Sequence, residues 1–166
     1  MKNDRLGASV LSALLISNVD AGLAASLELK PHHRSLGIIT SDCDDVTYVA
    51  LDEATKAADV EVVYARSMYA GAGNASTKLA GEVIGILAGP NPEEVRSGLD
   101  VAVYEIENGA SFYSANDDDS IPYFAHCISR AGSYLSEGAN AEEGTAIAYL
   151  IASPRDALVA LDAALQ

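Results

Sequence analysis

One stretch of the chain, residues 35–67, constrains the fold more than any other because it has the order strand, acidic turn, helix, strand. Leu36 to Ile39 is an apolar run of strand length, and the aspartate-rich turn after it is suited to capping a helix N-terminus. Apolar positions then recur at helical spacing from Val46 to Ala58, and Val60 begins a second strand. The polar positions left for solvent on this helix are Asp52, Glu53 and Lys56. The unit predicts an α/β (α+β) fold with carboxylates gathered at one turn.

Elements of the same kinds flank this unit. Residues 10–17 predict a strand, and residues 21–29 predict a short helix that Pro31 closes. After the unit, residues 82–88 predict a strand and residues 93–107 a helix that begins with two glutamates. The first 25 residues loosely resemble a secretory signal, but Asp4 in the charged region and Ser12 in the apolar run favour the strand.

Composition and charge exclude several classes of partner. Hydrophobic residues make up 49% of the 166 and charged residues 20%, which suits a globular core or a chain that buries much surface in an assembly. The net charge of −14 argues against nucleic acid and anionic membranes, and it suits a cationic or neutral small ligand. No apolar stretch reaches the roughly 20 residues that cross a bilayer. Cys43 and Cys127 are too few for a disulfide scaffold and lack metal-binding spacing, which favours reduced cytoplasmic thiols.

An internal repeat predicts two related domains. The strand at residues 10–17 is echoed at residues 123–129, and the letters of Val49–Asp52 recur unchanged at Val159–Asp162. Both echoes have an offset of about 110 residues, which indicates a tandem duplication. We therefore expect a first domain at residues 1–112 and a second at residues 113–166. The second stops inside or just after its equivalent helix, so about 50 residues of a full repeat are expected to be missing at the C-terminus.

Most motifs that could carry chemistry have a simpler interpretation. The sequence GAGNASTK at Gly71–Lys78 lacks the second glycine of a P-loop, which favours a surface loop. His32 and His33 are adjacent, so on an extended chain they are expected to point apart and not to share a metal. His126 lies in a predicted strand as a core or interface residue. We find no spacing typical of a catalytic, metal or cofactor site, so the sequence gives no positive case for catalysis.

The acidic turn is the best candidate site. Asp42, Asp44 and Asp45 crowd one turn, where like charges repel. One interpretation is that one of them caps the helix while the others are solvated; the other is a cation site, where an ammonium group relieves the repulsion. Glu82 and Phe112 could join such a site, the ring by holding a cation against its face. A second acidic run, residues 117–119, is interpreted as a solvated linker between the repeats.

The long segment from His32 to Asp100, which begins HHRSLGIITSDCDDVTYVALDEATKAADVEVVYARS, closely resembles the L-type shell proteins of the ethanolamine-utilisation bacterial microcompartment. The likeness continues through ENGASFYSAND, AHCISRAGSYLS, AIAYLIA and ALDAAL, and so covers essentially the whole chain. The resemblance implies tandem circularly permuted bacterial microcompartment (BMC) domains, of which the second is incomplete here. It also implies a structural protein of the cytoplasmic microcompartment shell, with no enzymatic activity and no cofactor or metal.

The same resemblance implies an assembly and a ligand. Such chains form a homotrimer that mimics a hexamer and tiles the shell together with other shell proteins. The family has a gated central pore and a small acidic pore in each subunit, which binds ethanolamine. By resemblance, Asp44, Asp45 and Glu82 line the small pore and Phe112 contacts the ligand. Ethanolamine carries the ammonium charge that a group of carboxylates should prefer.

Two alternatives come from other functional classes. A soluble amine-binding sensor could use the same acidic pocket without assembly, and it would bind amines tightly as a monomer. A small α/β enzyme could use the aspartates as acid and base, and it would show turnover. The enzyme also requires a nucleophile or cofactor motif, which the sequence does not offer. A shell tile predicts large assemblies that depend on concentration.

Overall fold

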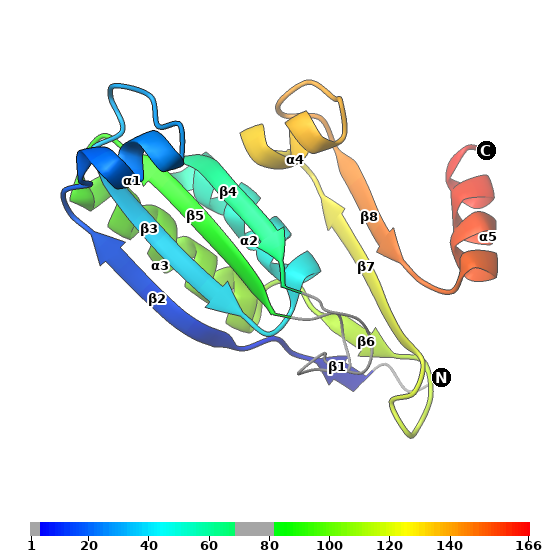
Figure 1. Ribbon diagram of the computed structural model, residues 1–166. Helices are drawn as coiled ribbons and strands as arrows, with labels where there is room; N and C mark the ends of the chain where they lie inside the picture. The colour runs from blue at the N-terminus through cyan, green and yellow to red at the C-terminus, as the bar shows by residue number, and fades with distance from the viewer. Residues whose placement is uncertain (1–3, 69–81) are drawn as a thin grey trace.

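The computed structural model describes residues 4–68 and 82–166, and the described chain forms two four-stranded antiparallel sheets (Figure 1). The first sheet has the order β2 (Val10–Ile16), β3 (Ser35–Ser41), β5 (Val83–Gly89), β4 (Glu61–Ser67). The second has the order β1 (Asp4–Leu6), β6 (Phe112–Ser114), β7 (Pro122–Ile128), β8 (Ile147–Ile151). The helices are α1 (Ala21–Ser26), α2 (Asp44–Ala57), α3 (Pro92–Asn108), α4 (Ser133–Gly138) and α5 (Pro154–Ala164).

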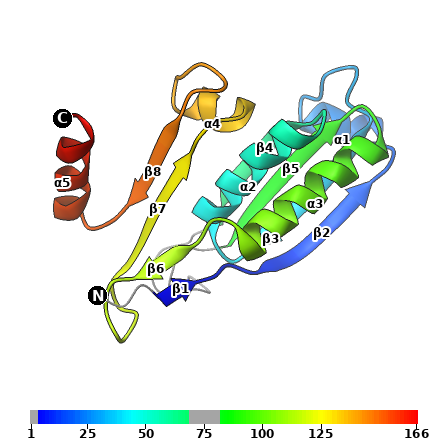
Figure 2. The same cartoon turned by 180° about the vertical axis from the view of Figure 1, so that it is seen from behind.

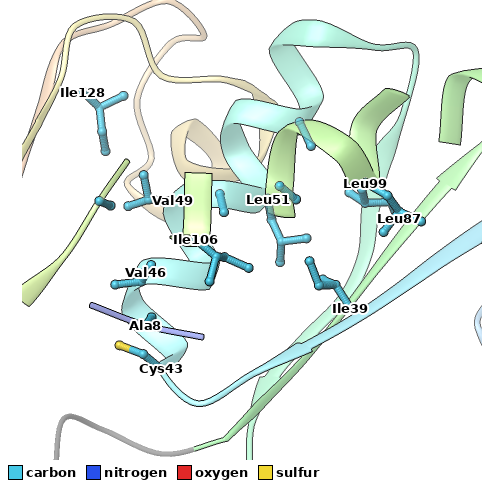
Figure 3. Close-up of a cluster of buried hydrophobic side chains, with 14 of the residues drawn as sticks. Ala8, Ile39, Cys43, Val46, Val49, Leu51, Leu87, Leu99, Ile106 and Ile128 are labelled. Atoms are coloured by element: carbon cyan, nitrogen blue, oxygen red, sulfur yellow. The ribbon is translucent and has the colours of Figure 1, made fainter. Parts of the chain in front are cut away.

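Helices α2 and α3 lie side by side on one face of the first sheet, and α1 lies on the other (Figures 1 and 2). The buried apolar side chains between the helices and the sheet form the main core (Figure 3). Two strand glycines bring the helices close to the sheet. A Cβ at Gly37 would lie 2.7 Å from Leu99 of α3, and one at Gly85 would lie 2.7 Å from Leu51 of α2. Substituting either glycine would therefore force buried side chains of the facing helix to shift.

Sequence patterns predicted most element positions in the first half. The strand–turn–helix–strand order of residues 35–67 is confirmed, and α3 begins with Pro92 after the Asn91 cap, whose side chain accepts from the Glu94 N–H. Helix α1 ends at Ser26, earlier than predicted. The expected side-chain cap of α2 is wrong. Its N-cap is Cys43, which makes no capping hydrogen bond, while Asp42 accepts from the backbone N–H of Ser9 at 2.7 Å.

In the second half, the strand predicted at residues 123–129 is confirmed as β7 and the helix expected around residues 159–164 as α5, whereas β6, α4 and β8 were not predicted. Residues 117–119 form part of the exposed turn between β6 and β7, so this acidic run closes a hairpin and does not link two domains. Strand β1, from the start of the chain, pairs with β6 in the second sheet. The predicted boundary at residue 112 falls at the start of β6, and the two-domain division stays a prediction. The predicted loop Gly71–Lys78 lies outside the described residues.

Helix α2 of the first half contacts the start of α4 in the second half at Asp52. The prediction that Asp52 lies on the solvent side of α2 is wrong. Its side chain is 0% exposed, and its two carboxylate oxygens accept from the backbone N–H groups of Gly132 at 2.7 Å and Leu135 at 2.8 Å. Lys56 lies 3.6 Å from this carboxylate and donates to the carbonyl of Arg130 at 2.9 Å. Helical periodicity misplaced Asp52 because the surface that buries it belongs to a segment about 80 residues away.

Gly132 makes this contact possible. A Cβ at this position would lie 2.7 Å from the backbone oxygen of Asp52 and closer still to the Thr55 hydroxyl. Backbone cannot move aside as a flexible side chain can, so a residue with a side chain here would separate α4 from α2.

None of the helices in the described residues has the length and apolar character needed to cross a bilayer.

Substituting Asp52→Ala is expected to cost roughly 2–4 kcal/mol in the free energy of unfolding, because it leaves two backbone N–H groups without their acceptor. Urea unfolding measures the change. Glu53→Ala, on the same helix turn and partly exposed, is the matched control and should cost less than about 1 kcal/mol. Equal losses in the two variants would contradict a special role for Asp52.

Candidate functional site

Asp44 and Asp45 form the first turn of α2, where the positive end of the helix dipole favours negative charge. Both side chains are half-buried, and Asp44 Oδ1 accepts from the backbone N–H of Asp45 at 2.9 Å. The structure therefore places two adjacent carboxylates at one helix end with limited access to solvent. Such a pair has a net negative field that a cation would neutralise.

Tyr149 of β8 reaches this site from the second sheet. Its hydroxyl donates to Asp45 Oδ1, so Asp45 is held by a helix of one half and a strand of the other. Tyr149, Phe124 and Phe112 form a row of three rings, which we call the aromatic row. The Tyr149 and Phe124 ring centroids are 5.3 Å apart, and those of Phe124 and Phe112 are 5.2 Å apart. The row connects the predicted site residue Phe112 with the acidic pair.

Burial sets the electrostatics of Asp45. Loss of solvent raises the pKa of its carboxyl above the ordinary value, and the charge of Asp44 raises it further. The hydrogen bond from Tyr149 acts in the opposite direction and lowers the pKa of Asp45. Burial and the neighbouring carboxylates raise the pKa of the Tyr149 hydroxyl, which therefore stays a donor at neutral pH. Ionised Asp45 thus costs free energy that an external positive charge could offset.

The other two predicted site residues differ in their surroundings. Glu82 is exposed and comes directly before β5, whose first residue, Val83, pairs with Ser41 at the end of β3. Glu82 therefore lies at the end of the sheet where α2 begins. Phe112 is 2% exposed and belongs to the main core, so most of its ring packs against protein. A ligand role for these residues remains a prediction.

Sequence reasoning missed Tyr149. It lies in β8, a strand that the sequence patterns did not predict, 104 residues from Asp45, and nothing in its spacing relates it to the acidic turn. Its neighbour in the sheet, His126, is half-buried on β7 and its ring centroid lies 5.9 Å from that of Phe124. An aromatic residue paired across the strands with a histidine is the one signal that could have drawn attention to this position.

The structure also corrects the prediction for the adjacent histidines. His32 and His33 lie in a turn before β3, not on an extended strand, and their ring centroids are 4.3 Å apart. Both Nε2 atoms lie 3.6 Å from Glu61 Oε1. This cluster is at the opposite end of the first sheet from the acidic pair, because Glu61 begins β4 and pairs with Ala88 near the end of β5.

Comparison with known proteins identifies the class. Residues 35–116 match the family model of the BMC domain. The mixed sheet-and-helix fold and this match define the chain as a bacterial microcompartment protein.

The particular family follows from relatives that align with nearly the whole chain. The chain is 68% identical over all its residues to the shell protein EutL of Clostridium perfringens, and covers 76% of that protein. It is 53% identical to EutL of Salmonella typhimurium, with 98% of this chain and 74% of that protein aligned. The crystal structure of the ethanolamine utilization protein EutL from Leptotrichia buccalis has a TM-score of 0.89 and 65% identity, covering 99% of this chain and 76% of that one. The chain belongs to the EutL family of bacterial microcompartment shell proteins.

This assignment confirms the resemblance seen in the sequence. The chain is a structural component of the shell of the ethanolamine-utilisation microcompartment. The relatives are shell proteins and not enzymes, so the alternative of a small acid–base enzyme is set aside.

The free energy of unfolding of the Asp45→Asn variant is expected to exceed that of the wild type, by an amount that grows as pH rises. Below the ordinary carboxyl pKa, Asp45 is protonated in both the folded and unfolded states and the difference is small. Between that value and the raised folded pKa, only the unfolded state ionises freely, so wild-type stability falls with rising pH. The amide of the variant has no such cost and keeps an acceptor for Tyr149. Thermal unfolding from acid to neutral pH measures the difference, and a constant offset would contradict a raised pKa.

Proposed function

We propose that the chain assembles as a homotrimer that mimics a hexamer, with a gated central pore and a small acidic pore in each subunit that binds ethanolamine. In this proposal Asp44, Asp45 and Glu82 neutralise the ammonium group, and Phe112 contributes an apolar contact. The observation that carries the proposal is the half-buried carboxylate pair at the start of α2. A net charge of −14 on the whole chain favours approach of a cation.

Charge explains why an amine suits this site. An ammonium group beside Asp45 compensates a carboxylate whose ionisation burial disfavours, and it also relieves repulsion from Asp44. The ammonium group has three N–H donors, and carboxylate oxygens can accept from them directly. The hydroxyl of ethanolamine adds one further hydrogen-bonding group, which distinguishes it from a simple alkylamine.

The Asp45–Tyr149 hydrogen bond supports a link between ligand binding and conformation. An ammonium group that takes Oδ1 of Asp45 competes with a donor from the second sheet. Binding would then change the contact between the two sheets. A ligand shifts a conformational equilibrium only when it binds the two states with different affinity, and competition for one oxygen is a physical source of such a difference.

Calorimetric titration tests the acidic pore. Ethanolamine should bind the wild type, and Asp45→Asn should weaken binding by at least about tenfold, since a charge-assisted hydrogen bond contributes about 1.5–3 kcal/mol. Asp100→Asn, an exposed position on α3, is the control for loss of one negative charge. Ethylene glycol has a similar size without the charge and should not bind. Equal affinity of the wild type and Asp45→Asn would refute this site.

Sedimentation equilibrium tests the assembly. We expect a species with three times the 17.2 kDa mass of the chain at high protein concentration. Several large apolar side chains are more than half exposed in the isolated chain, as an assembling protein requires: Leu11, Leu14, Tyr104 and Ile121. A chain that stays monomeric at every concentration and still binds ethanolamine would instead favour the soluble amine-binding sensor.

A further inference from the structure

His32, His33 and Glu61 bring three metal-binding side chains together, far from the acidic pair. One ring nitrogen of each histidine and one carboxylate oxygen of Glu61 all lie within 4.8 Å of one another. The histidines come from the turn between α1 and β3, and Glu61 from the start of the edge strand β4 (Figure 1). The cluster therefore joins two segments that are separate in sequence and lie at the same end of the first sheet.

The fold holds this turn in place. The backbone N–H of His33 donates to the carbonyl of Lys30 at 2.9 Å, and that of Arg34 donates to the carbonyl of Gly89 at 2.9 Å. The His33 side chain is only 2% exposed, while that of His32 is 57% exposed. One imidazole is thus fixed by packing, and the second can adjust toward it from solvent.

We propose that His32, His33 and Glu61 form a binding site for a divalent transition-metal ion such as Zn²⁺. A tetrahedral ion with ligands at about 2.0–2.2 Å requires donor atoms roughly 3.3–3.5 Å apart. Each Nε2 is already 3.6 Å from Glu61 Oε1, so only small rotations are needed. Two imidazoles and one carboxylate leave the fourth position for water.

The donor set selects the kind of ion. Imidazole nitrogen suits Zn²⁺, Ni²⁺, Co²⁺ and Cu²⁺, whereas Mg²⁺ and Ca²⁺ prefer sites made of oxygen atoms. The acidic pair at Asp44 and Asp45 offers oxygen only, so the two sites differ in ion preference. A titration with Mg²⁺ therefore separates the histidine cluster from the carboxylates elsewhere on this acidic chain.

Lys30 competes with a metal ion for the Glu61 carboxylate. Its Nζ lies 2.5 Å from Glu61 Oε2, so it already neutralises the carboxylate that the metal would use. The backbone N–H of Lys30 also faces His33 Nδ1 at a long 3.4 Å, a contact that is lost when Nε2 binds metal and Nδ1 carries the proton. The lysine charge on Oε2 repels a cation placed at Oε1, and metal binding must also open the Lys30–His33 contact. Removing the lysine charge should accordingly strengthen metal binding.

A bound ion would connect the turn before β3 to β4. In the sheet, β5 lies between β3 and β4, and the cluster spans its C-terminal end. The ion would add a link between an edge strand and a loop that side-chain contacts alone join. Because the ion binds only the folded arrangement, it should raise the melting temperature of the chain.

Calorimetric titration of the whole chain with ZnCl₂ tests the proposal. We expect one Zn²⁺ per chain, no binding of Mg²⁺ at this site, and at least about tenfold weaker Zn²⁺ binding in His32→Ala and in Glu61→Gln. His126→Ala is the matched control, because His126 is the third histidine of the chain and lies outside the cluster. His32 is exposed, so its substitution should leave the fold intact. The control should bind Zn²⁺ like the wild type.

Two further measurements make the test decisive. Lys30→Met should bind Zn²⁺ more tightly than the wild type, and Zn²⁺ should raise the melting temperature of the wild type but not that of His32→Ala. Zn²⁺ binding that is unchanged in both His32→Ala and Glu61→Gln would overturn the proposal. So would Mg²⁺ competing with Zn²⁺ at equal concentration, because that result places the metal on carboxylates alone.

Discussion

The buried carboxylate of Asp52 is the interaction on which the relation of the two sheets depends. It provides acceptors for two backbone N–H groups at the start of α4, and in return α4 and the preceding turn remove Asp52 from solvent. A buried charge is tolerated only where hydrogen bonds and an opposite charge compensate for lost hydration, and Lys56 supplies that charge. The fit also requires that Gly132 has no side chain. The position of the second sheet, and with it the place of Tyr149 beside Asp45, follows from this junction.

A carboxylate at the candidate site has the same need for hydrogen bonds and an opposite charge, but the described residues meet that need less fully. Asp52 is compensated by two backbone donors and Lys56, whereas among the described residues Asp45 receives one hydroxyl donor and has a like charge as its neighbour. The first carboxylate is satisfied and rigid; the second is under-compensated and open to an external cation. Two aspartates on the same helix therefore have different roles because different segments cover them.

Local patterns predicted the strands and helices of the first sheet, but they missed β1, β6, α4 and β8 and failed where distant segments meet. The apolar periodicity of residues 35–67 and the Asn91–Pro92 start of α3 are local signals, and the structure confirms the elements that they predicted. Asp52 was misassigned because amphipathic spacing describes one helix alone. Tyr149 was missed because its partner is 104 residues away. The two histidines were expected to point apart because an extended chain was assumed where a turn exists. Among the predicted site residues, Asp44 and Asp45 were singled out by local crowding of charge, while Glu82 and Phe112 were only possible additions until the family resemblance placed them in the same pore.

Helix α5 has a consequence for how this chain associates. None of its residues is buried, and large apolar side chains on it or directly after it are well exposed: Leu158, Val159, Leu161 and Leu165. A helix of 11 residues is marginal in water unless its apolar face packs against something. The conformational entropy lost when this helix forms must therefore be offset by packing of its apolar face. A contact on that face would lose part of its interaction energy to ordering α5, which would make it weaker and more readily reversed than its area implies.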